Sequence, residues 1–118
     1  MVNLPLDVLM YFFFAMDIEM IENNLDTKAS YAGKDFDTFI ADLKDIFAQV
    51  QAAGVHRLSA TMGHKPGNPH QYFGFEAKNT SIRIPITFEV LEDGLSIASI
   101  QDDTNYIKDK DVRSTLTI

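Results

Sequence analysis

The spacing of apolar side chains changes once along this chain, and the change separates a helical first half from a strand-rich second half. Nearly every position from Leu6 to Met16 is apolar, which predicts a helix that is covered on several sides. Asp17 interrupts this run and is expected to cap a short second helix that ends near Leu25. A third helix is predicted from about Asp35 to Gly54, because its apolar positions recur at helical spacing. These positions are Phe36, Phe39, Ile40, Leu43, Ile46, Phe47 and Val50.

Beyond Gly54 apolar and polar residues alternate, which is the pattern of strands with one buried face. Turn residues separate these runs, most clearly Glu92-Asp93-Gly94, which predicts a hairpin. Residues 102–118 are polar and mixed, and the pattern predicts only a short strand there, at Ser114–Ile118. The other predicted strands span residues 27–32, 55–62, 71–77, 82–90 and 95–100. Together these elements predict one α+β domain, with helices on the concave face of a curved antiparallel sheet.

Composition and charge exclude several classes of partner. The 118 residues match the usual size of one domain, and the chain contains no cysteine, which removes disulfides and thiolate nucleophiles. Ten basic and 17 acidic residues give a formal charge of −7, and the basic residues are scattered. Nucleic acids and anionic membranes need clustered Lys and Arg, so neither is an expected partner.

The apolar first segment, LPLDVLMYFFFAM, is not typical of a signal peptide or a membrane span. No Lys or Arg precedes Lys28, and Asp7 lies inside the apolar run. The segment is also too short to cross a bilayer. A buried helix in a soluble, cytoplasmic protein is the expectation, and the absence of cysteine fits a reducing compartment.

The order of the predicted elements resembles that of the nuclear transport factor 2-like, or SnoaL-like, superfamily. The residues YFFFAMDIEMIENNL resemble its opening of an apolar helix, an aspartate and a second helix. The strand, glycine turn and third helix are matched by SYAGKDFDTFIADLKDIF, and the closing hairpin by ITFEVLEDGLSIASIQDD. The resemblance covers about residues 5–103 and leaves 104–118 as a polar extension. It implies a cone-like fold with an apolar cavity and homodimers that pair through the outer face of the sheet.

The steroid isomerase branch of that superfamily can be tested residue by residue. The tyrosine of its first helix is matched by Tyr11. Its catalytic base, an aspartate at the end of the first strand, falls at Ala32 or Gly33, and its second aspartate falls at Ile86 or Thr87. None of these four residues can exchange a proton as a carboxylate does, so the resemblance does not extend to the isomerase mechanism.

The remaining candidates for acid and base chemistry are His56, Tyr11 and Asp17. His56 shares a predicted strand face with Leu58 and Met62, and a neutral imidazole in a cavity is a candidate general base. Structural roles compete with each assignment: a packed histidine, a core tyrosine and a helix cap. His64 and His70 flank a loop, but no third ligand is adjacent, so no metal or other cofactor is expected.

Three functional hypotheses stay open. The leading one is a small ligand-binding or accessory domain without established catalysis. Its basis is that the chain is rich in aromatic residues, with nine Phe and four Tyr, but has no convincing pair of acid and base groups. The second is a small isomerase, cyclase or dehydratase that uses His56 with Tyr11 or Asp17. The third is a homodimeric or partner-binding module that uses the outer sheet face, where Arg83, Thr87 and Glu89 are expected. The predicted cavity lining of the leading hypothesis is Tyr11, Phe14, Phe39, Leu43, His56, Phe73 and Phe88.

Overall fold

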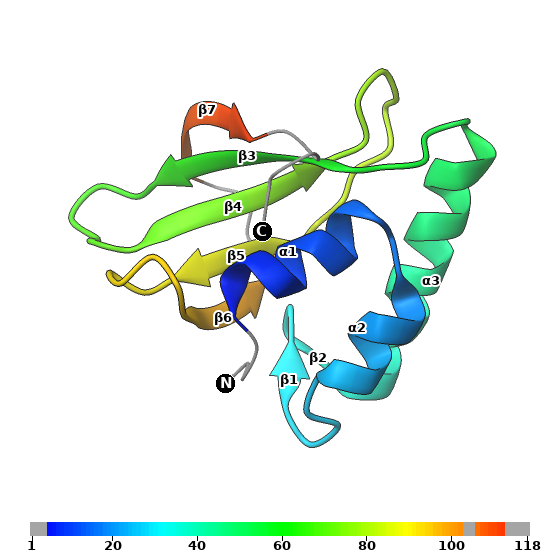
Figure 1. Ribbon diagram of the computed structural model, residues 1–118, viewed down its shortest axis with the longest axis horizontal. Helices are drawn as coiled ribbons and strands as arrows, with labels where there is room; N and C mark the ends of the chain where they lie inside the picture. Colours follow the sequence, from blue (N-terminus) through cyan, green and yellow to red (C-terminus); the bar gives the residue numbers. More distant parts are fainter. Residues whose placement is uncertain (1–4, 103–105, 113–118) are drawn as a thin grey trace.

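Three helices and a five-stranded antiparallel sheet make up most of the computed structural model, which describes residues 5–102 and 106–112 (Figure 1). This confirms the predicted α+β class. The helices are α1 (Leu6–Phe14), α2 (Ile18–Asn24) and α3 (Phe36–Ala52). A small hairpin precedes α3, and its two strands, β1 (Ser30–Tyr31) and β2 (Lys34–Asp35), have two residues each. The sheet strands are β3 (Ser59–His64), β4 (Gln71–Glu76), β5 (Thr87–Val90), β6 (Ile97–Gln101) and β7 (Ile107–Val112).

Local hydrogen bonds set the helix ends where the sequence predicts them. The Asp17 carboxylate accepts the backbone N–H of Met20 at 3.2 Å and caps α2. Asp35 caps α3 in the same way, through the backbone N–H of Thr38 at 2.8 Å. At the other end of α3, Gly54 has a φ of 86°, and the N–H of Val55 donates to the carbonyl of Val50. This is a Schellman ending, and it stops α3 at the predicted glycine.

Strand β1 has two residues and is shorter than the strand predicted over residues 27–32, and it forms a hairpin with β2. Its two turn residues, Ala32 and Gly33, have φ values of 53° and 74°, and a two-residue turn with both φ values positive matches the twist of a hairpin. The backbone N–H of Ala32 also donates to the carbonyl of Ile100 at 2.9 Å. This bond holds the hairpin against β6, beside the start of α3.

The strands of the sheet lie in the order β6-β5-β4-β3-β7, and all neighbours are antiparallel. Two predicted boundaries are wrong here. The sequence predicts a strand from residue 55, but β3 begins at Ser59, so His56 precedes the strand. The polar stretch after Asp102 contains β7, which pairs with β3 and which hydrophobic alternation did not reveal. The strand predicted at Ser114–Ile118 lies outside the described residues.

Pro85 accounts for the shortening of the strand predicted over residues 82–90. The N–H of Ile86 donates to the carbonyl of Ile84 at 2.8 Å, which places Pro85 at the centre of a three-residue turn. Proline also lacks the N–H that a paired strand needs. Pairing therefore begins at Thr87, although Ile84 and Ile86 are buried as the alternation predicts. Residues 82–86 become a connecting segment that passes close to α3.

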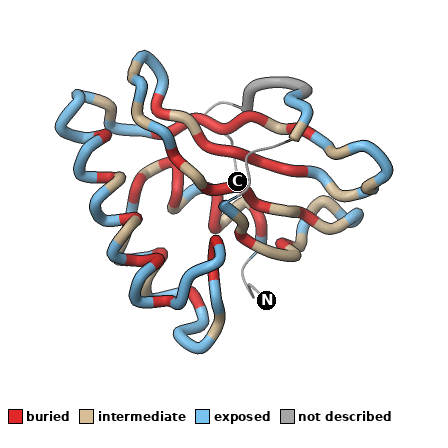
Figure 2. Tube along the Cα trace, turned by 180° about the vertical axis from the view of Figure 1, so that it is seen from behind, coloured by how far each residue is buried: buried red, intermediate tan, exposed pale blue. Residues whose placement is uncertain are grey.

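Aromatic rings fill the space between α1 and the centre of the sheet. Phe13 of α1 lies with its ring centroid 5.3 Å from that of Phe75 and 5.0 Å from that of Phe88. Phe14 also contacts Phe75, edge to face, with ring centroids 5.8 Å apart. Figure 2 shows that burial concentrates along the central strands and fades toward the loops. The middle of the helix–sheet interface is therefore packed core.

Among the described residues no helix is both long and apolar enough to cross a membrane.

Candidate functional site

A cavity of about 220 Å³ lies where α3 faces the 83–86 segment, beyond the end of the aromatic core. One wall comes from α3 and carries Phe39, Leu43 and Ile46. The opposite wall comes from Pro85 and Ile86, which lie in the turn before β5. Ala32 of the hairpin and Asp102 after β6 complete the lining, with Lys34, Asp42 and Arg83. These parts of the chain thus meet around one cavity, with apolar side chains in its walls and charged groups at its border.

Two of the four charged side chains at this cavity neutralise each other. Lys34 and Asp42 form an ion pair and hydrogen bond, and both side chains are partly exposed. Arg83 and Asp102 are also exposed, and within the described part of the chain neither side chain has a hydrogen bond or an ion pair. The four charges sum to zero. As far as the described residues show, the cavity therefore has one cation and one anion without partners beside its apolar side chains.

A wider hollow of about 560 Å³ runs along the 77–84 connection and reaches Lys108. Arg83 borders this hollow as well as the smaller cavity. Most of its lining is polar and belongs to the exposed connection between β4 and β5, and it is more open than the smaller cavity. It is a surface depression rather than an enclosed site, and the smaller cavity is the better candidate for holding a ligand.

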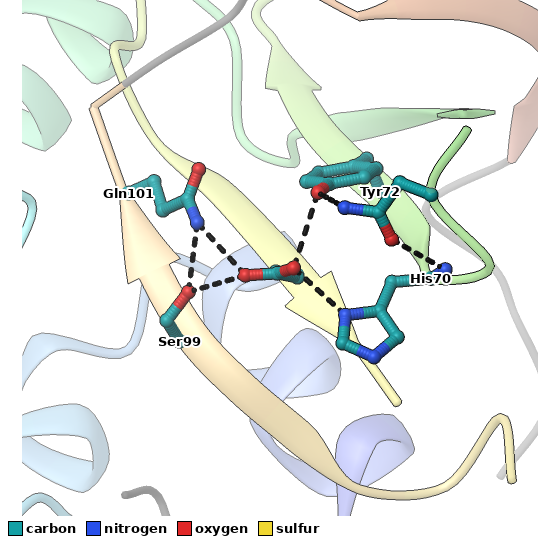
Figure 3. A network of polar contacts seen from close by, with 6 residues as sticks. His70, Tyr72, Ser99 and Gln101 are labelled. Carbon is teal, nitrogen blue, oxygen red and sulfur yellow. Dashed lines mark hydrogen bonds and ion pairs between the residues drawn. The ribbon is translucent and has the colours of Figure 1, made fainter. Parts of the chain in front are cut away.

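On the side of β5 that faces away from the aromatic core, a polar network is centred on the Glu89 carboxylate (Figure 3). One carboxylate oxygen, Oε2, lies 2.7 Å from His70 Nδ1 and accepts the Tyr72 hydroxyl at 3.1 Å. The other, Oε1, accepts the Ser99 hydroxyl at 3.1 Å and the Gln101 side-chain amide at 2.9 Å. Strands β4, β5 and β6 thus contribute side chains to one anion.

The network lowers the pKa of Glu89 below its usual value. The hydrogen bond from His70 is the main cause, and the hydrogen bonds from Ser99 and Tyr72 act in the same direction. Partial burial raises the pKa but is outweighed. The Glu89 side chain is only 16% exposed, so these contacts hold an ionised carboxylate that water barely reaches.

Short contacts from the β3–β4 loop orient the donors of this network. The backbone N–H of His70 donates to Asn68 Oδ1, and the Asn68 amide donates to the Tyr72 hydroxyl, both at 2.8 Å. The Lys65 ammonium lies 4.8 Å from the centroid of the Tyr72 ring. Residues that the sequence marks only as loop are therefore fixed in place.

Tyr106 covers part of the same side of the sheet. Its ring stacks on Tyr72 with centroids 6.3 Å apart, and its hydroxyl donates to the carbonyl of Thr61 at 3.1 Å. A Cβ at Gly63 or Gly74 would collide with this ring, so both glycines are required for its close approach. The Tyr106 ring thus covers part of this face of the sheet.

The three acid and base candidates of the sequence do not meet. Tyr11 is 45% exposed on α1, and His56 is exposed in the connection before β3. Asp17 is used as a helix cap. Within the described residues no hydrogen bond or ion pair joins His56 to Tyr11 or Asp17. The expectation that Tyr11 and His56 face the interior does not match their exposure. Tyr11 lies on the solvent-exposed side of α1, and His56 lies before the start of β3.

Two of the residues predicted to line a cavity, Phe39 and Leu43, border the observed one. Phe14, Phe73 and Phe88 are buried in the core cluster and do not border this cavity. The helical stripe of α3 predicts which of its residues face inward, and this part of the prediction matches the structure. How far core side chains from other elements fill that space depends on packing between distant segments, which the stripe does not encode.

The residues expected on the outer face of the sheet are divided among three environments. Glu89 lies in the polar network, and Thr87 is completely buried. Arg83 lies before β5, at the border of the two hollows. No group of three or more metal-ligating side chains gathers in the described ranges. His70, which the sequence placed in a polar loop, proves to be part of the Glu89 network.

No protein-family model matches this chain, and no match was found among curated proteins or solved structures.

Proposed function

We propose that this chain is a small-ligand-binding domain without catalysis of its own, and that its ligand occupies the cavity between α3 and the 83–86 segment. The observation that carries the proposal is one cavity that combines apolar side chains in its walls with Arg83 and Asp102, two charged groups that have no partner among the described residues. Binding sites for small molecules are concave, mostly apolar and supplied with a few polar groups that fix orientation. At about 220 Å³ the cavity suits a compact metabolite rather than a drug-sized compound.

The proposal includes the cone-like arrangement of the nuclear transport factor 2-like superfamily. Its support is the order of elements, three helices and a small hairpin followed by an antiparallel meander. In that superfamily the cavity lies between helices and sheet, and the cavity here is bordered by α3, the hairpin and the segment leading into β5. The resemblance and the cavity thus point to the same end of the domain.

The side chains around the cavity favour binding over chemistry. The position that the resemblance assigns to the isomerase base is Ala32 or Gly33, and Ala32 lies in the cavity wall. Ala32 has no group that can accept a proton. The histidine and tyrosine proposed for catalysis, His56 and Tyr11, are exposed elsewhere. His56 and Tyr11 therefore do not supply this lining with the general base and general acid that a proton-transfer enzyme requires.

Ligand-observed NMR with the full chain tests the proposal, using 3-methylbutanol as a small apolar probe. Ile46 is partly buried and borders the cavity, so Ile46→Trp should fill it and abolish binding of the probe. Ala48→Trp is the matched control, because Ala48 is exposed on the same helix and does not border the cavity. Probe binding by the natural chain and by Ala48→Trp, together with its loss in Ile46→Trp, is the expected result. Equal binding by all three proteins, or by none, would remove the cavity as the site.

A further inference from the structure

We infer that the ligand is a short apolar zwitterion, whose carboxylate is bound by Arg83 and whose ammonium group is bound by Asp102. A free apolar amino acid is the simplest molecule of this class. The inference rests on the proposed function, since it names the ligand class of the same cavity.

The cavity border carries two positively and two negatively charged side chains. Lys34 and Asp42 form an ion pair with each other, so together they add no net charge and are less available to bind a ligand. Arg83 and Asp102 remain, one cation and one anion, and neither has a partner within the described residues. A ligand that satisfies both must itself carry one negative and one positive group. A zwitterion does so and, like the lining, has no net charge.

The chemistry of each side chain assigns the two ends of the ligand. A guanidinium presents planar paired donors that match the two oxygens of a carboxylate. A carboxylate such as Asp102 accepts hydrogen bonds and attracts the three donors of an ammonium group. Both side chains are exposed, so they lie at the mouth, while Phe39 and Leu43 are buried in the wall. The charged end of the ligand is thus directed outward and its apolar chain inward.

The net charge of the chain cannot by itself account for binding of a zwitterion, so specific charged side chains must do so. The whole chain carries a formal charge of −7, which repels a simple anion and attracts any simple cation. Discrimination in favour of a zwitterion therefore requires Arg83 at this one place. Arg83 also borders the wider hollow, where Lys108 is paired with Glu76.

Three compounds with the same branched chain test the inference by isothermal titration calorimetry: leucine, 3-methylbutylamine and 4-methylpentanoate. The first carries both charged groups, the second only the ammonium and the third only the carboxylate. Leucine should bind the natural protein more tightly than either of the others, by about tenfold or more, because each charged contact contributes on that scale.

Two variants with matched controls assign the contacts. Arg83→Gln should weaken leucine and 4-methylpentanoate but leave 3-methylbutylamine unchanged, and Asp102→Asn should weaken leucine and the amine but not the acid. Arg57→Gln and Asp37→Asn are the controls, because both residues are exposed and neither borders the cavity. Equal affinity for the three compounds, no binding of leucine, or effects in the controls as large as in the variants would overturn the inference.

Failure of the inference and failure of the proposed function give different results. If 3-methylbutanol binds and Ile46→Trp abolishes that binding, while leucine does not bind, the cavity remains a ligand site and the zwitterion is wrong. If neither leucine nor the alcohol binds, and Ile46→Trp changes nothing, both proposals fall.

Discussion

The two sides of strand β5 achieve stability in opposite ways. On one side Phe88 is fully buried against Phe13 and Phe75, and its contacts are apolar and tolerant of direction. On the other side Glu89 is held by hydrogen bonds, each of which needs a donor in a fixed place. Phe88 thus stabilises the fold through the apolar area that it buries, whereas its neighbour Glu89 does so through the geometry of its hydrogen bonds. The apolar side should cost more to damage, and the polar side should respond to pH.

The largest effect is expected from Phe88→Ala. Removing a fully buried ring leaves a cavity between α1 and the sheet, and such changes cost about 3–5 kcal/mol of unfolding free energy. Urea denaturation of the natural chain and the variant measures the loss. Tyr11→Ala removes an aromatic ring that is 45% exposed on α1, and it should change the unfolding free energy by less than about 0.5 kcal/mol. Similar losses in the two variants would contradict the packing of Phe88.

A smaller effect, with a pH signature, is expected from Glu89→Gln. Because folding lowers the pKa of Glu89, its stabilisation is present above the ordinary glutamate pKa of about 4.3 and is lost as the pH falls through the folded pKa. The substitution should cost about 1–3 kcal/mol at neutral pH, since donors lose a charged acceptor. At acidic pH the variant and the natural chain should approach each other.

Urea denaturation at several pH values between neutral and acidic measures that convergence. Glu92→Gln is the matched control, because Glu92 is exposed in the β5–β6 turn and lies outside the network. A constant gap between Glu89→Gln and the natural chain at every pH would show that the carboxylate charge is not the stabilising element.

The smallest effect is expected from Gly74→Ala on the polar side of the sheet. The added methyl group would press against the Tyr106 hydroxyl, and the ring must move to admit it, at a cost of about 1 kcal/mol. Tyr106→Phe removes the oxygen in question, together with its hydrogen bond to Thr61. The double variant should therefore lose less than the sum of the two single losses. Strict additivity in thermal denaturation would mean that Tyr106 does not pack on Gly74.

The cavity and the network were predictable to different extents. Phe39 and Leu43 follow from the helical stripe of α3, and the outward position of Glu89 follows from strand alternation. His70, 19 residues before Glu89, becomes its partner only through the pairing of β4 with β5. Alternation gives the face of a strand, but not the register that sets which residues of two strands lie opposite each other. Arg83 reaches the cavity because the chain turns at Pro85, which the sequence marks only as a place where pairing fails.

The sequence by itself determined the elements whose signals are local. Asp17 and Asp35 cap helices through bonds to residues three positions away, and Gly54 ends α3 because it adopts a positive φ. Such contacts form within a few residues and are therefore present in the pattern of the chain. Tertiary structure alone decided that β7 joins β3, that Phe14 and Phe88 fill the core, and that His56 lies outside it. Those outcomes depend on contacts between distant segments, whose geometry exists only once the chain has folded.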